Sequence, residues 1–260
     1  MQTDSRKNTI IVALVLSVVC SVLVSATAVL LKPMQDKNRS LERKKNVLAA
    51  AELRSEGESV DDAFEKVTVY FVDIETGEFE KGGDDAKYFR DFNSITTEPE
   101  TSINLTKKED IAGIGRIAKE IPVYLVFNDG ELEQVILPVY GSGLWSTMFG
   151  FMAVEGDLET ISGLTFYDQQ ETPGLGGEVS NPRWQDQWEG KKIYNEKDEV
   201  AIQLVKGGVD PSKPGSEHKI DALSGASLTS RGVENLVKFW LSDKGFGTFL
   251  DRLKEEGIDG

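Results

Sequence analysis

Two apolar runs meet at a tight turn in the stretch PVYLVFNDGELEQVILPV, residues 122–139. Val123–Phe127 and Leu132–Val139 are rich in β-branched and other large apolar residues, which favour extended strands. Between them, Asn128-Asp129-Gly130 supplies residues that tolerate the positive φ angles of a short hairpin turn. The stretch therefore predicts a β-hairpin, and with it a domain built on a sheet.

Further strand-like and helix-like segments surround this hairpin without a regular alternation. Strands are expected at Lys66–Asp73, Leu144–Val154, Ile161–Tyr167 and Val200–Lys206. Helices are expected at Leu41–Leu53, from Asn181-Pro182 through the core-packing pair Trp184 and Trp188, and from Ser230 to Leu241. This mixture predicts an α+β domain.

The segment Asp221–Ser230, DALSGASLTS, combines hydroxyl groups with an unobstructed backbone. Four hydroxyls fall within seven residues, on Ser224, Ser227, Thr229 and Ser230, and Gly225 leaves room for a ligand near the chain. The following helix, expected to be capped by Thr229 or Ser230 and stopped by Gly245, would point unpaired N–H groups at this segment and favour a phosphate. A Ser-rich turn that only caps a helix is the alternative.

Composition narrows the class of function. The chain has 260 residues, a formal net charge of −15 and a pI near 4.6, which argues against a nucleic-acid partner because such a partner requires a basic face. Cys20 is the only cysteine and lies in the apolar run, so the remaining chain can form neither a disulfide nor an iron–sulfur cluster. His218 is the only histidine and is expected in a loop or at the surface. Phosphate-loop and dinucleotide motifs are absent, so the chain is not expected to bind NADH itself.

A membrane-spanning helix is expected at residues 9–31. These 23 residues carry no charge and would form a helix of about 34 Å, enough to cross a hydrocarbon core of about 30 Å. A cleaved signal peptide ending near Ala26–Ala28 is the alternative, but the apolar run continues through Leu31. The expected organisation is a short N-terminus at residues 1–8, the span at 9–31, a helical stalk at 32–56 and a domain at 57–260.

Charge alone leaves the orientation of the span open. Basic residues are more numerous after the span, from Lys32 to Lys45, than before it, where Arg6 and Lys7 stand. Counted in this way, the positive-inside rule places the domain in the cytoplasm, although large domains cross membranes largely regardless of charge.

Several strings together resemble one known family. They are Leu137–Trp145 (LPVYGSGLW), Gly163–Phe166 (GLTF), Glu171–Glu178 (ETPGLGGE), Val205–Gly208 (VKGG) and the segment Asp221–Ser230. From residue 9 to about residue 250, the chain is similar to the NqrC family of the sodium-translocating NADH:quinone oxidoreductase, and less closely to the RnfG proteins of the related Rnf complex. One departure matters, because the family usually has Thr at the position that accepts the flavin phosphate, where this chain has Ser227.

The resemblance implies a flavin site and a setting. It implies FMN bound covalently to Ser227 through a phosphoester, with Thr229 as the second possible acceptor, and a mixed α/β FMN-binding domain. Ser224, Gly225 and Ser230 would help to hold the phosphate, while Thr172, Gly174, Leu175, Gly176, Lys206 and Gly207 would lie near the flavin or its phosphate.

The resemblance also implies partners and a location. The partners would be the other membrane subunits of the complex and, during maturation, a flavin transferase. The location would be the bacterial inner membrane, with the domain in the periplasm. The implied role is an electron relay between NADH and ubiquinone, coupled to sodium export. A protein that has lost its flavin, an anchored small-ligand-binding module and the Rnf-type protein are the alternatives.

Overall fold

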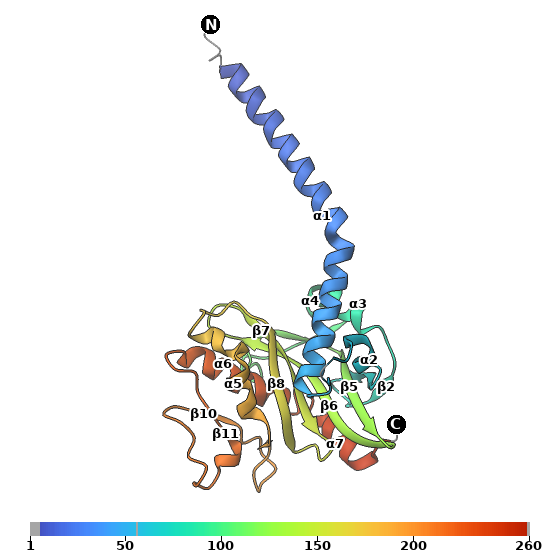
Figure 1. Cartoon of the computed structure of the whole chain (residues 1–260), viewed down its shortest axis with the longest axis vertical. Coiled ribbons are helices and arrows are strands. Elements are labelled where there is room, and N and C mark those ends of the chain that lie inside the picture. Colours follow the sequence, from blue (N-terminus) through green and yellow to red (C-terminus); the bar gives the residue numbers. More distant parts are fainter. Residues whose placement is uncertain (1–5, 56, 259–260) are drawn as a thin grey trace. The chain divides into compact units, whose positions relative to one another are not determined.

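The structure is a computed structural model that describes residues 6–55 and 57–258. The chain divides into two compact units, residues 1–41 and residues 42–260 (Figure 1). The helix α1 (Arg6–Ala50) supplies the described part of the first unit and continues into the second. Within the described residues, α1 is the one helix long and apolar enough to cross a membrane.

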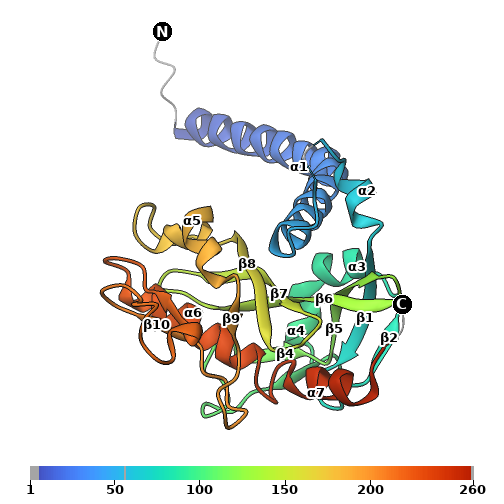
Figure 2. The same ribbon diagram turned by 60° about the horizontal axis from the view of Figure 1, so that its bottom comes forward.

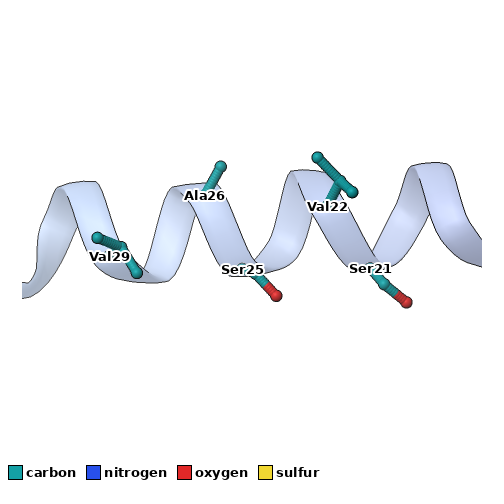
Figure 3. Close-up of a pocket in the computed structure, with 5 residues that line it drawn as sticks. All are labelled: Ser21, Val22, Ser25, Ala26 and Val29. Carbon is teal, nitrogen blue, oxygen red and sulfur yellow. The ribbon is translucent and has the colours of Figure 1, made fainter.

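The apolar part of α1 has the surface of a lipid-facing helix. Its most apolar window has a mean hydropathy of 2.7, and its large side chains are exposed within the chain. Figure 3 shows the small residues Ser21, Ser25 and Ala26 beside Val22 and Val29, where they line a shallow hollow on the helix. The Ser21 hydroxyl donates to the Ser17 carbonyl oxygen at 2.7 Å, so this polar group is satisfied within the helix.

The second unit is built on a sheet of seven antiparallel strands in the order β2-β1-β5-β6-β7-β8-β9. The strands of this sheet are β1 (Val67–Asp73), β2 (Phe79–Lys81), β5 (Glu120–Asn128), β6 (Glu131–Ser142), β7 (Thr147–Glu155), β8 (Thr160–Asp168) and β9 (Lys191–Lys192). Two smaller sheets pair β3 (Ser102–Asn104) with β4 (Arg116–Ala118) and β10 (Gln203–Val205) with β11 (Lys219–Asp221).

Short helices connect the strands, and two longer ones end the chain. They are α2 (Val60–Phe64), α3 (Asp85–Arg90), α4 (Phe92–Thr97), α5 (Pro182–Gln185), α6 (Ser227–Trp240) and α7 (Gly247–Glu256), with the 3-10 turns η1 (Gly176–Ser180), η2 (Asp186–Trp188) and η3 (Ser216–His218). The predicted fold class, α+β behind one membrane-spanning helix, is confirmed by these elements.

Both faces of the central sheet are covered, because successive side chains of its strands point to opposite faces. In β6, Val135 and Leu137 belong to the larger core, while Ile136 between them belongs to a second core. The end of α1 contributes Val47 and Leu48 to that second core. Side chains of α6 and α7 contribute to the larger one. On that side, the rings of Phe79 in β2 and Phe249 in α7, the red helix in Figure 2, lie 5.5 Å apart.

The hairpin predicted from residues 122–139 is confirmed. Strands β5 and β6 pair as far as Asn128 and Glu131, so the turn consists of Asp129 and Gly130. Their φ angles are 52° and 87°, the positive values that a tight hairpin turn of this kind requires. Trp184 and Trp188 are buried with edge-to-face rings, as expected for core residues.

The structure differs from the sequence-based expectations at two places in the sheet region. Residues 144–146 were expected to begin a strand, but β7 begins at Thr147 and the preceding residues form a turn in which Leu144 and Trp145 are exposed. The apolar side chains of these two residues therefore lie at the surface of the domain and not in a buried strand. The strand expected at Val200–Lys206 is shorter, because β10 covers only Gln203–Val205, and it pairs with β11 in a separate parallel sheet.

The region expected to be a stalk also contains core residues. Val47, Leu48 and Ala50 are buried against the sheet, so the last turns of α1 are a layer of the domain rather than a spacer. A Cβ on Gly163 of β8 would lie 2.4 Å from the Ala50 carbonyl oxygen, which shows how closely the two backbones approach. The amphipathic pattern predicted the helix but could not identify the surface that it covers.

Two leucines seven residues apart on α1 test this layer. Leu48 is 1% exposed and Leu41 is 37% exposed. We expect Leu48→Ala to lower the free energy of unfolding of the domain by about 2–5 kcal/mol, because it opens a cavity in the second core. Leu41→Ala should change it by no more than about 0.5 kcal/mol. Denaturant unfolding of the full chain in detergent, followed by tryptophan fluorescence, measures both, and equal effects would contradict the core assignment.

Candidate functional site

The helix α6 is held against the end of β6, and this contact positions the segment Asp221–Ser230. A Cβ on Gly232 would lie 2.4 Å from the Ser142 carbonyl oxygen, so only glycine lets the helix approach the strand so closely. Further along α6, the Trp240 ring nitrogen donates to the Tyr140 carbonyl oxygen at 2.7 Å. The first turn of α6 therefore lies beside the turn that joins β6 to β7.

The hydroxyl-rich segment forms a tight turn that is closed from within. Gly225 has a φ angle of 72°, a conformation that favours glycine. The Ser230 hydroxyl accepts a hydrogen bond from the Leu223 N–H and donates one to the Ala226 carbonyl oxygen, both at 3.0 Å. Ser230 therefore shapes the turn from the buried side.

Ser227 is the first residue of α6, and its side chain is exposed. Within the residues that the structure describes, its hydroxyl makes no side-chain hydrogen bond. The first N–H groups of a helix have no partner inside the helix, and the helix dipole favours negative charge at this end. An exposed hydroxyl thus stands where a phosphate can be held by backbone N–H groups.

The structure corrects the predicted start of this helix. Ala226 is the N-cap residue and makes no side-chain capping bond, so neither Thr229 nor Ser230 caps the helix. Both lie in its first turn and are buried, Thr229 with 1% exposure. The sequence placed the hydroxyls in one short segment, and the helix exposes that of Ser227 while it buries those of Thr229 and Ser230.

Glu171 is a buried carboxylate next to this first turn. It is 4% exposed, and its Oε2 accepts from the Thr229 hydroxyl at 2.5 Å while its Oε1 accepts from the Trp145 N–H at 2.8 Å. Burial raises the pKa of this carboxyl, but the hydrogen bonds from Thr229 and from backbone N–H groups at residues 144–146 outweigh it, so the pKa lies below its ordinary value. The carboxylate is therefore charged at neutral pH.

The glycine-rich loop after Glu171 lies against the same turn. Thr172 accepts hydrogen bonds on its carbonyl oxygen from the N–H groups of Leu175 and Gly177, and Gly174 has a φ angle of 74°. A Cβ on Gly225 would lie 3.0 Å from a methyl carbon of Leu175, so the two loops are in contact. The structure therefore brings the loop predicted from ETPGLGG beside the segment that holds Ser227.

The exposed apolar side chains of the domain belong to segments that lie near the site. In the described part of the domain, residues 42–55 and 57–258, the large exposed apolar residues are Ile111, Leu144, Trp145, Leu175 and Leu228. Leu228 follows Ser227 in the chain, and Leu175 contacts Gly225. Leu144 and Trp145 lie in the 142–146 turn. Ile111 lies beside this turn, because the next residue, Ala112, accepts a hydrogen bond from the Ser142 N–H. Apolar surface gathered around one polar point is typical of a ligand site.

Lys206 and Gly207 lie further from the centre of the segment. They follow β10, which runs parallel to β11, and Val205 pairs with Asp221 at the start of the segment. Lys206 is exposed, and no ion pair or side-chain hydrogen bond links it to Ser224–Ser230 among the described residues. The topology places both residues beside the entry of the segment.

Sequence reasoning did not single out Glu171, Leu144, Trp145 or Leu228. Leu144 and Trp145 lie in the string GSGLW, and Glu171 begins the string ETPGLGG. A carboxylate next to a glycine-rich loop is the one signal that could have indicated a buried contact. The residues fit an FMN group, because an exposed hydroxyl and free helix N–H groups suit the phosphate and the apolar side chains suit an aromatic ring.

Comparison with known proteins identifies the class of the domain. Residues 143–242 match the family described as FMN-binding domain, so the class defined by fold and site is an FMN-binding domain that follows a membrane-spanning helix. The NqrC protein of the Na(+)-translocating NADH-quinone reductase of Vibrio alginolyticus is 47% identical over 253 residues, covering 97% of this chain and 96% of its own. The corresponding Pseudomonas aeruginosa protein is 44% identical over 256 residues, covering 97% of each chain.

A solved structure is also similar. The crystal structure of Shewanella oneidensis NqrC aligns with a TM-score of 0.75 at 39% identity, covering 82% of this chain and 97% of that chain. The chain therefore belongs to the NqrC family of Na(+)-translocating NADH-quinone reductase subunits. The family predicted from the sequence strings is confirmed.

The two kinds of serine in the segment make a stability prediction. Ser230→Ala leaves the buried Leu223 N–H without its acceptor, and we expect it to lower the free energy of unfolding by about 1–3 kcal/mol. Ser227→Ala should change it by no more than about 0.5 kcal/mol, because this hydroxyl is exposed. Denaturant unfolding of chains made without a flavin transferase provides the measurement. A large loss for Ser227→Ala would show a structural role for its hydroxyl.

Proposed function

We propose that the chain carries FMN covalently, through a phosphoester on the Ser227 hydroxyl, and relays electrons within a sodium-translocating NADH:quinone oxidoreductase. FMN supplies the redox chemistry, because its ring system takes up and releases electrons. The observation that carries the proposal is the exposed Ser227 hydroxyl at the N-terminus of α6, with the exposed apolar Leu228 next to it in the chain and Leu175 against the adjoining Gly225.

The two possible acceptors differ in accessibility. Ser227 is exposed, whereas Thr229 is buried and its hydroxyl is engaged by Glu171. A transferase must bring a phosphorus atom to the acceptor oxygen, which is possible at Ser227 without moving the helix. We therefore assign Ser227 as the acceptor, and a serine hydroxyl can form the same phosphoester as the threonine of the family pattern.

The neighbouring residues have separate roles in this proposal. Ser224 and Gly225 are exposed beside the acceptor and leave space for the phosphate, while the buried Ser230 and Thr229 keep the turn in shape. Thr172, Gly174, Leu175 and Gly176 belong to the loop whose Leu175 side chain contacts Gly225, and the flavin ring is proposed to pack against this loop. Lys206 and Gly207 flank the entry of the segment and provide a charge and an accessible backbone.

The relatives supply the setting for this proposal. They are named as subunits of a sodium-translocating NADH-quinone reductase, and the identity extends over nearly the whole chain. We infer that this chain assembles with the other membrane subunits of such a complex and that a flavin transferase loads it. This naming favours the sodium-translocating complex over the Rnf-type alternative. The domain is proposed to face the periplasm of the bacterial inner membrane, since large domains can cross regardless of flanking charge.

Attachment can be tested at the acceptor itself. Coexpressed with a flavin transferase, the unaltered chain should gain the mass of one FMN adduct, Ser227→Ala should lose it, and Ser227→Thr should keep it. A phosphoester requires the side-chain oxygen, which only alanine removes. Intact-mass measurement and peptide mapping decide the outcome. An adduct that persists in Ser227→Ala and maps to Thr229 would contradict the assignment, and its absence from the unaltered chain would contradict the proposal of covalent FMN.

Topology can be tested with fusion reporters after Gly260. Alkaline phosphatase fused there should be active, because this enzyme requires the periplasm and the proposal places the domain there. A green fluorescent protein that matures only in the cytoplasm should remain dark at the same position. The opposite pair of results would place the domain in the cytoplasm, as the basic residues between Lys32 and Lys45 indicate when counted alone.

A further inference from the structure

Glu171 joins three segments that are far apart in the sequence. It belongs to the loop after β8, its Oε1 accepts from the Trp145 N–H in the β6–β7 turn, and its Oε2 accepts from the Thr229 hydroxyl in the first turn of α6. The Trp145 bond is 2.8 Å long and the Thr229 bond 2.5 Å. Charge-assisted bonds of this length are stronger than ordinary hydrogen bonds, so the contact can fix the relative positions of the segments.

Two glycines make room for this carboxylate. A Cβ on Gly143 would lie 2.5 Å from its Oε1, and a Cβ on Gly176 would lie 2.8 Å from its Oε2 and 2.5 Å from the Thr229 hydroxyl oxygen. Neither glycine has a positive φ angle, so close approach rather than backbone conformation accounts for them. The backbone therefore approaches the carboxylate closely on two sides, at Gly143 and at Gly176.

The three joined segments meet at the first turn of α6, the turn that begins with Ser227. The β6–β7 turn carries the exposed Leu144 and Trp145, the loop carries Leu175, and the helix carries Ser227. We propose that Glu171 is a positioning residue for FMN: its carboxylate holds the apolar walls of the site and the acceptor turn in one arrangement. This inference rests on the proposed function, because it concerns how the same site receives its cofactor.

The charge of Glu171 is compatible with an anionic cofactor nearby. Its oxygens are occupied by N–H and O–H donors of the chain, and the carboxylate faces the first turn of α6, where the helix dipole favours negative charge. The Thr229 hydroxyl is directed to the carboxylate and is not available to a ligand. On this turn, Ser227 is therefore the residue with an exposed hydroxyl that can serve as the acceptor.

The test compares variants of the carboxylate and of one of its donors. Glu171→Ala removes both arms of the contact, and Thr229→Val removes one arm with little change in side-chain shape. Glu178→Gln is the matched control, because Glu178 lies in the same loop and its carboxylate accepts from Asn181 rather than from the site. Each full-length chain is purified in detergent without flavin and then incubated with the transferase and its flavin donor.

Two readouts are used, one of which needs no flavin. The initial rate of FMN attachment, followed by intact mass, should fall about tenfold in Thr229→Val and at least as far in Glu171→Ala, which corresponds to loss of one hydrogen bond to a charged group. The double variant should be no more than about twofold slower than Glu171→Ala, because both changes break the same contact. Hydrogen exchange at the Trp145 amide, measured before flavin is added, should accelerate in Glu171→Ala and stay unchanged in Glu178→Gln.

The outcomes separate this inference from the function on which it rests. If the unaltered chain gains no FMN, covalent attachment fails, whereas exchange at Trp145 still decides whether Glu171 holds the turn. If the unaltered chain is loaded and both variants are loaded at its rate with unchanged exchange, the positioning role is overturned. An equal loss in Glu178→Gln would overturn it too, since the effect would not depend on the contact. If circular dichroism shows Glu171→Ala to be unfolded, Thr229→Val carries the test.

Discussion

The central sheet has two apolar faces, and the need to cover both determines how the rest of the chain is used. Strands β5 and β6 alternate between the two cores, with Val135 and Leu137 on one side and Ile136 on the other. An uncovered face would expose large apolar side chains to water, so each face requires its own layer of helix. The end of α1 supplies one layer, and α6 with α7 supplies much of the other.

This constraint links the membrane helix to the fold and the fold to the site. Because the end of α1 is a layer of the domain, one helix contains both the long apolar run and a part of the domain core. Because α6 is held against β6 through Gly232 and Trp240, the N-terminus of α6 has a fixed position beside the β6–β7 turn. The placement of Ser227 therefore depends on core packing.

The proposed site would hold the FMN phosphate in a strongly acidic chain, and the residues described around it include no cluster of basic side chains. Lys206 stands only at the edge, and the acidic Glu171 is at the centre. What the first turn of α6 offers instead is a set of N–H groups with the positive end of a dipole. Net charge governs solubility and nonspecific partners, whereas a local array of N–H groups decides what binds at one turn.

The sequence by itself determined the elements whose signals are local. The Asn-Asp-Gly turn between two apolar runs specified the hairpin, the uncharged run at residues 9–31 specified the apolar part of α1, and the strings around Gly174 and Ser227 specified the family. Tertiary structure alone decided the rest. It turned Ser227 outward and Thr229 inward, made residues 144–146 an exposed turn, and placed the last turns of α1 in the core. A short stretch of sequence does not encode which hydroxyl of a helix turn is buried, or which carboxylate accepts a hydrogen bond from it. Both depend on contacts between residues that lie far apart in the chain, such as Glu171 and Thr229.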